Sequence, residues 1–143
     1  MSDARACVFC KIVAGAAPAS VVFRDDEVVA FMAASPSAPG HVLVVPRAHY
    51  ETCFDLDDEL AGPLFRMAIR IARAIKQLYQ PDGIRLVQNN GPAAGQSVFH
   101  VHVHVLPATL GRRTSIDDSG RSADRAELDR LAAEIGAALK DGG

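Results

Sequence analysis

The chain has 143 residues, of which 49% are hydrophobic and 22% are charged, and its formal net charge is −2. This composition is typical of one globular domain and excludes a disordered chain, while the small negative charge gives no support to nucleic-acid binding. No apolar run reaches the roughly 18 residues of a membrane-spanning helix. The start MSDARACVFC lacks the pattern of an export signal. We therefore expect a cytoplasmic protein with no membrane partner and no disulfide framework.

The first half of the chain contains short elements. A helical turn is expected at 10–15, where CKIVAG ends on a glycine, and strands are expected at 20–25, 27–33 and 41–46. The loop SPSAPG at 35–40 is dense in proline, serine and glycine, and it separates the last two strands.

The longest helical pattern follows these strands. Apolar residues recur at spacings of three and four with basic residues between them. The apolar positions are Leu60, Leu64, Met67, Ala68, Ile71, Ile75 and Leu78. Asp55 or Asp57 can cap the start of this helix, which is expected to end before Pro81.

Two further strands and a second helix complete the predicted architecture. The strands are expected at 83–89 and 98–106, on either side of a glycine-bearing loop at 90–97, and the amphipathic helix at 123–140. Five strands with one long helix between the third and the fourth predict an α+β domain around an antiparallel sheet. The length suits a single domain over residues 1–143.

Three of the five histidines lie at alternate positions in QSVFHVHVHVLP. On a strand, His100, His102 and His104 would share one face, with neighbours about 6.6 Å apart, and the intervening valines would share the other. That spacing can bracket a phosphate-sized group. A solvent-exposed polar face is the alternative, but three histidines in register favour a chemical site.

The sequence Cys7-Val8-Phe9-Cys10 is a CxxC motif at the N-terminus. Two cysteines at this spacing can bind one zinc ion, but a closed tetrahedral site needs two more ligands, for which His49 and His100 are candidates. The alternatives are a redox-active pair, which usually opens a helix inside a βαβ unit, and two unrelated buried cysteines.

The segment 89–97, NNGPAAGQS, leads directly into the histidine motif. Glycines in such a turn allow backbone N–H groups to form an anion-binding concavity. Asn89, Gln96 and Ser97 add side-chain donors. An ordinary hairpin loop is the alternative, but the adjacent histidines favour the anion-binding interpretation.

Histidines beside an anion-binding loop suit phosphoryl chemistry. A neutral imidazole can attack phosphorus, and neighbouring donors can stabilise the developing charge or assist the leaving group. One alternative is a hydrolase in which His100, His102 and His104 hold a catalytic zinc ion, which a span of about 13 Å between the outer pair disfavours. Another is a non-catalytic binding module. No P-loop motif is present to support an NTPase of that class.

These motifs resemble the histidine triad (HIT) superfamily, in particular the zinc-bearing bacterial relatives of its Hint branch. The resemblance covers CVFCKIVAG, FMAASPSAPGHVLVVPRAHY and NNGPAAGQSVFHVHVHVLP. It implies a HIT-like domain with a core at about 5–108, followed by a polar stretch and helix at 109–143. It also implies a homodimer that takes a small nucleotide as substrate and no nucleic acid.

The resemblance also implies a role for each site residue. His102 would attack the α-phosphate of a nucleoside phosphoramidate or related conjugate and form a nucleotidyl-histidine intermediate, assisted by His104 and supported by His41. Phosphate and leaving-group contacts would come from Asn89, Gly95, Gln96, Ser97 and His104. Structural zinc would be held by Cys7, Cys10, His49 and His100. Cleavage of dinucleoside polyphosphates and non-catalytic nucleotide binding are the alternative functions.

One position departs from the pattern that the resemblance implies. Family members usually carry an aspartate two residues after Phe31, where its carboxylate accepts hydrogen bonds from the ribose hydroxyls. Here the residue is Ala33. We therefore expect weak discrimination between ribonucleotides and deoxyribonucleotides.

Overall fold

The computed structural model describes residues 6–112, 116 and 122–142. Its elements in chain order are α1 (Val8–Val13), β1 (Val21–Arg24), β2 (Val28–Met32), β3 (Val42–Pro46), α2 (Asp58–Tyr79), β4 (Gly83–Val87), a 3₁₀ turn (Pro92–Ala94), β5 (Val103–Ala108) and α3 (Arg125–Gly142). Each predicted helix and strand is present, and the largest difference in boundaries lies at the histidine motif.

The five strands form one antiparallel sheet in the order β1-β2-β3-β5-β4. This confirms the predicted α+β architecture, a five-stranded antiparallel sheet with one long helix and a C-terminal helix. β2 and β3 are buried along their whole length. Their sequences VVAFM and VLVVP are apolar at every position, as expected for central strands covered on both faces.

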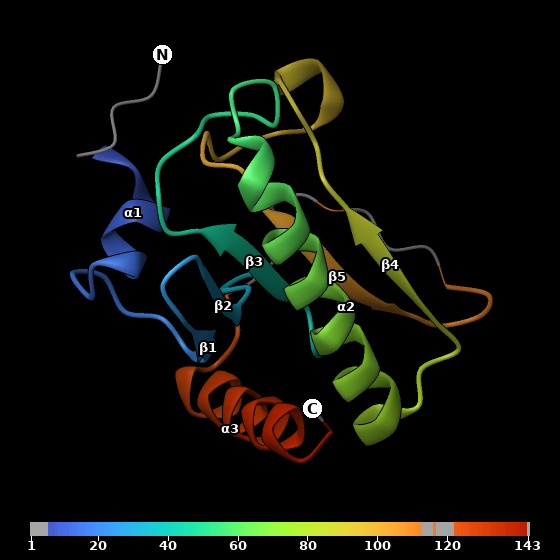
Figure 1. Cartoon of the computed structure of the whole chain (residues 1–143). Coiled ribbons are helices and arrows are strands. Elements are labelled where there is room, and N and C mark those ends of the chain that lie inside the picture. The colour runs from blue at the N-terminus through green and yellow to red at the C-terminus, as the bar shows by residue number, and fades with distance from the viewer. Residues whose placement is uncertain (1–5, 113–115, 117–121, 143) are drawn as a thin grey trace.

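The two faces of the sheet carry different helices (Figure 1). α2 and α3 pack on one face, where Ile71, Ile75 and Ile135 are completely buried in the larger apolar cluster. α1 packs on the opposite face, where Phe9 belongs to a smaller cluster with Phe31 of β2. Because side chains alternate along a strand, His104 of β5 points to the α1 face, opposite its neighbours in the larger cluster.

Helix α2 begins and ends close to its predicted limits. The Asp57 side chain caps it by accepting the Glu59 N–H at 3.0 Å, and the acidic first turn complements the helix dipole. The helix stops at Gln80, whose φ of 49° is left-handed, immediately before Pro81. Within the described part of the chain, no helix is long and apolar enough to cross a membrane.

The strand predicted at 98–106 is wrong in its boundaries, because β5 begins only at Val103 and runs to Ala108. The residues before Val103 form hydrogen bonds outside the sheet ladder. The Val101 N–H donates to the Tyr50 carbonyl at 2.8 Å, and His100 Nε2 donates to the Pro46 carbonyl at 2.8 Å. At the other end, the strand continues through Pro107 to Ala108. Pro107 pairs with β4 beyond the last β3 partner, where its missing N–H breaks no ladder.

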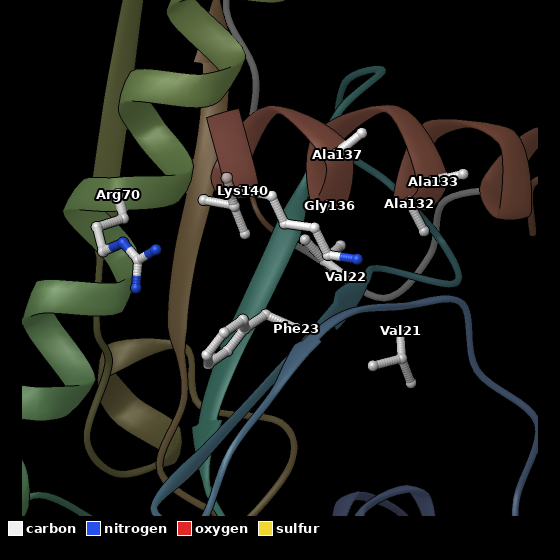
Figure 2. A pocket seen from close by; sticks show the side chains of 10 residues that line it. Val21, Val22, Phe23, Arg70, Ala132, Ala133, Gly136, Ala137 and Lys140 are labelled. Carbon is white, nitrogen blue, oxygen red and sulfur yellow. The ribbon is translucent and has the colours of Figure 1, made fainter. Parts of the chain in front are cut away.

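A groove of about 460 Å³ lies between β1, α2 and α3, away from the histidine motif (Figure 2). The Arg70 guanidinium lies 5.8 Å from the centre of the Phe23 ring, and its buried Nε has no hydrogen-bond partner among the described residues. None of the predicted site residues lines this groove. The candidate site lies on the α1 face of the sheet, where Cys7 packs and toward which His104 points.

Candidate active site and metal centre

Four side chains from three segments converge beside α1. Cys7 caps this helix and Cys10 lies in its first turn, while His49 follows β3 and His100 precedes β5. Their ligand atoms all lie within 4.8 Å of one another. The structure therefore brings together the predicted metal ligands, although they are separated by as many as 93 positions in the sequence.

The separations between these atoms suit a tetrahedral zinc ion. The His49 and His100 Nδ1 atoms are 3.3 Å apart, the Cys10 Sγ lies 3.2 Å from His49 Nδ1, and the Cys7 Sγ lies 3.5 Å from His100 Nδ1. Zinc bonds of about 2.0–2.1 Å to nitrogen and 2.3 Å to sulfur give tetrahedral edges of about 3.3–3.8 Å. The Cys₂His₂ donor set and its spacing thus fit a closed zinc site.

The neighbouring backbone prepares His100 as a ligand. Its Nε2–H donates to the Pro46 carbonyl at 2.8 Å, which leaves Nδ1 unprotonated and directed at the two thiols. Burial also lowers the pKa of His100 to about 4, so the ring is neutral near pH 7.

The redox alternative for the cysteine pair is disfavoured. Burial, with a smaller contribution from Cys7, raises the pKa of the Cys10 thiol to about 11. A redox-active or nucleophilic cysteine needs a lowered pKa. The pair instead suits a metal ion, which deprotonates the thiols on binding.

The second cluster contains His102, His104 and His41, which are 6%, 8% and 3% exposed. The His102 ring nitrogen Nδ1 lies 2.7 Å from the carbonyl oxygen of His100. A carbonyl only accepts hydrogen bonds, so His102 carries its proton on Nδ1. In the neutral ring, Nε2 is then the unprotonated nitrogen.

A chain of hydrogen bonds fixes the other two rings. The Ser37 N–H donates to His41 Nδ1 at 3.1 Å, so neutral His41 carries its proton on Nε2. That nitrogen lies 3.0 Å from His104 Nδ1 and donates to it, which places the proton of His104 on Nε2. The His104 ring, whose centroid lies 4.9 Å from that of His102, therefore carries its N–H donor in the same cluster as the unprotonated nitrogen of His102.

The glycine-bearing loop is held in place by Gln96, which is 4% exposed. Its Oε1 accepts the Gly91 N–H at 2.7 Å, and its Nε2 donates to the Glu51 and Val98 carbonyls at 2.6 and 3.1 Å. Both amide hydrogens are thus used by the protein itself. Gly91 and Gly95 have φ values of 90° and 93°, which other residues rarely adopt.

The other predicted contact residues surround this loop. Gly95 and Ser97 are exposed, and Asn89 is half-buried. A side-chain carbon at Gly95 would lie 3.6 Å from Asn89 Nδ2, which places these two residues side by side. The backbone N–H groups of the loop are largely used within it: those of Ala94 and Gln96 donate to the Gly91 carbonyl, that of Gly95 donates to the Pro92 carbonyl, and that of Gly91 donates to Gln96 Oε1. The expected backbone concavity is therefore not supported, and the side chains of Asn89 and Ser97 are the predicted donors that remain for an anion.

Comparison with known proteins agrees with this geometry. A family model described as the HIT domain matches residues 14–110. Protein hit of Bacillus subtilis (strain 168) is 45% identical over 107 residues, which are 75% of this chain and 74% of that protein. The chain belongs to the HIT family.

Two further HIT relatives bear on the site. A Zn-bound histidine triad family protein from Mycobacterium smegmatis has a crystal structure with a TM-score of 0.83 to this chain, at 34% identity over 97% of this chain and 96% of that one. With the cluster geometry, this supports structural zinc and the zinc-bearing branch. An adenylylsulfatase of Arabidopsis thaliana is 35% identical over 101 residues, 71% of this chain and 51% of its own length.

The HIT-domain match places the chain among nucleotide hydrolases and nucleotide-binding proteins. Helix α3 lies beyond the matched residues, yet Leu128, Leu131 and Ile135 belong to the same apolar cluster as α2.

Sequence reasoning missed two features of the site. These are the Phe9 ring, 5.2 Å from that of His102, and the Pro46 carbonyl that orients His100. No local sequence pattern marks either one.

The buried histidine pair predicts loss of stability in acid. Burial, with the nearby His102, lowers the pKa of His41 to about 4 and that of His104 to about 3. Below the unfolded-state histidine pKa of about 6.5, these two histidines bind protons in the unfolded chain but not in the folded chain. The free energy of unfolding therefore falls as the pH drops from about 6.5 toward 4. Each histidine should cost on the order of 2 kcal/mol by pH 4.5.

Denaturant unfolding between pH 7 and 4.5 measures this effect, with His41→Asn as the comparison. Asparagine retains an acceptor for the Ser37 N–H but does not titrate. The difference in the free energy of unfolding between the wild type and this variant should therefore become smaller as the pH falls. A difference that is constant with pH would contradict the assignment.

Proposed function

We propose that this HIT protein is a nucleotide hydrolase or transferase that acts at the α-phosphate of nucleoside phosphoramidates or related nucleotide conjugates. The observation that carries the proposal is the hydrogen bond from His102 Nδ1 to the His100 carbonyl, because it places the proton on Nδ1 and makes Nε2 the unprotonated, nucleophilic nitrogen of the neutral ring. The relative named an adenylylsulfatase supports the same class of substrate, an adenylyl group joined to a leaving group.

The proposed reaction has two steps. His102 Nε2 attacks the α-phosphorus, the bond from phosphorus to the leaving amine breaks, and a nucleotidyl-histidine forms. Water then attacks the same phosphorus, and the bond to His102 breaks. Overall, water gives its oxygen to the nucleotide and a proton to the amine, and His102 is regenerated.

The remaining residues would assist at stated atoms. The Nε2–H of His104 would donate to the phosphate or to the bridging atom, and His41 would keep that proton in place through its own hydrogen bond to His104 Nδ1. Ser97 and Asn89 would contact the phosphate through their side chains, while Gly95, whose N–H already donates to the Pro92 carbonyl at 3.0 Å, would shape the loop. Because both amide hydrogens of Gln96 already bond the backbone, we assign to Gln96 the support of this loop and not a direct phosphate contact.

The metal would have a structural role in this scheme. Cys7, Cys10, His49 and His100 would hold it in a closed site with no open position for substrate, and when bound it would cross-link α1 to the segments after β3 and before β5. A catalytic zinc ion held by the three histidines of the motif is disfavoured, since His100 Nδ1 turns toward the cysteines and His102 Nδ1 is occupied by a backbone carbonyl.

Turnover of adenosine phosphoramidate, run beside a His102 variant, tests the proposed function. Release of AMP by the wild type alone is the expected result. Nucleotide binding without turnover would favour the non-catalytic alternative. The predicted homodimer and the cytoplasmic location stay predictions.

Position 33 provides a test of sugar recognition. Ala33 is 5% exposed and belongs to the apolar cluster of the α1 face. The Ala33→Asp variant should gain more affinity for AMP than for deoxy-AMP, which lacks the 2′-hydroxyl, because each sugar hydroxyl bonded to a charged acceptor can contribute about 1.5–3 kcal/mol before offsets.

Titration calorimetry with both nucleotides measures this change, and Ala33→Asn is the matched control with an uncharged acceptor. The unmodified protein should discriminate little between the two sugars. A strong preference for AMP in the unmodified protein would show that other groups recognise the ribose.

A further inference from the structure

Two of the groups that contact the His102 ring come from the metal-binding segments, in addition to the neighbouring His104 ring, whose centroid lies 4.9 Å away. The first is the carbonyl of His100, which accepts the His102 Nδ1–H at 2.7 Å, while the side chain of His100 belongs to the metal cluster. The second is the Phe9 ring, whose centroid lies 5.2 Å from that of His102 at an interplanar angle of 88°. Such an edge-to-face contact is a favoured arrangement of two aromatic rings.

Phe9 lies between the two metal-binding cysteines in sequence and is itself buried, with 7% of its surface exposed. It also makes edge contacts with Phe31 at 5.3 Å and with His100 at 6.0 Å. Within the first turn of α1, the Cys10 N–H lies 3.5 Å from the Cys7 Sγ. Anything that fixes Cys7 and Cys10 therefore also fixes the ring between them.

A hydrogen bond to one ring nitrogen does not by itself fix the plane of an imidazole, which also depends on the groups packed against the ring. The carbonyl of His100 sets the position of Nδ1, but the direction of the Nε2 lone pair also depends on the plane of the ring. Phe9 packs against that ring, as does His104, and so restricts its plane. Attack on phosphorus needs the lone pair aligned, and small misplacements of a reacting group can lower a rate substantially.

We propose that Phe9 is a positioning residue for His102, and that the Cys7–Cys10 metal centre holds the nucleophile in line through it. This inference rests on the proposed function, in which His102 attacks the α-phosphate. Phe9 acts through His102 and takes no part in the chemistry itself. The metal cross-link and the catalytic geometry are thus connected by one side chain.

The experiment compares three zinc-loaded proteins: the wild type, Phe9→Leu and Val13→Ala. Leucine keeps position 9 apolar but removes the ring. Val13→Ala is the matched control, because Val13 lies on the same helix and in the same apolar cluster, and the substitution also removes buried volume. Zinc content and the unfolding temperature of each protein are measured first.

Two measurements then separate positioning from a general loss of stability. The first is the rate and KM of adduct formation with adenosine phosphoramidate in a single turnover. The second is the His102 tautomer in the substrate-free, zinc-loaded protein, read from long-range ¹H–¹⁵N NMR of the imidazole. Neither depends on the unfolding temperature as long as the protein is folded.

Phe9→Leu should lower the rate of adduct formation about tenfold with KM within about twofold, and it should reduce the Nδ1–H form of His102. Val13→Ala should retain both wild-type values despite a lower unfolding temperature. Removal of zinc from the wild type with a chelator, below the unfolding temperature, should shift the tautomer in the same direction as Phe9→Leu.

Equal effects of the two substitutions, a change confined to KM, or a tautomer that ignores both Phe9→Leu and chelation would overturn the inference. Failure of the wild type to form any adduct is a different outcome. It would defeat the proposed function, while the NMR comparison would still decide whether Phe9 and the metal centre orient His102.

Discussion

His102→Ala should lose more activity toward a nucleoside phosphoramidate than any other single substitution in the site. The variant lacks the nitrogen atom that would bond to phosphorus, so the covalent intermediate cannot form at all. The expected loss exceeds the factor of about 10²–10⁴ that is typical of a missing general acid or base. Steady-state kinetics with purified protein measure it.

His104→Ala is the matched comparison, because it removes an imidazole of similar burial from the same motif. It retains the nucleophile and loses one donor, so its loss should lie within about 10²–10⁴. Both variants should still bind AMP, since the loop held by Gln96 is unchanged. A larger loss for His104→Ala than for His102→Ala would reverse the two assignments.

Cys10→Ser should produce the largest loss of stability among the variants considered. It removes one of the four ligands of the metal cluster, and with it the cross-link between α1, His49 and His100. Structural zinc contributes its binding free energy to folding, so a loss of about 3 kcal/mol or more is expected, which is about 10 °C in unfolding temperature. The effect on stability should exceed the effect on the chemical step.

Cys53→Ser makes the same chemical change at an exposed cysteine outside the cluster, so it controls for the substitution itself. Elemental analysis should find one zinc per chain in the wild type and in Cys53→Ser, and less in Cys10→Ser. Metal-replete wild type without zinc, or equal unfolding temperatures for the two variants, would contradict the structural role.

Periodicity predicted the fold well because most elements follow local rules. The continuous apolar runs of β2 and β3 and the three-and-four spacing of α2 reflect which faces are buried, which the sequence itself encodes. The predicted limits of β5 were wrong for the opposite reason. The observed limits depend on the Tyr50 and Pro46 carbonyls, which lie about 50 positions away in the sequence and take the bonds that a longer strand would need.

The candidate site divides in the same way. The cysteine spacing and the histidine motif identified the ligands and the triad, since residue type and spacing carry that chemistry directly. The protonation pattern of the histidines could not be predicted, because it is set by two backbone groups, the Ser37 N–H and the His100 carbonyl. Nearly every residue has such groups, so no residue type marks them. For Gln96 the residue type indicated a donor, but only the structure shows that both its hydrogens are already bonded.

Capture of the intermediate tests the assignment of His102 most directly. The wild type is mixed with a phosphoramidate labelled on the nucleotide, quenched without acid to preserve a phosphorus–nitrogen bond, digested and mapped by mass spectrometry. Covalent catalysis by His102 predicts a nucleotidyl label on that residue, absent in His102→Ala. A label on His104, or full turnover by the His102→Ala protein, would contradict it.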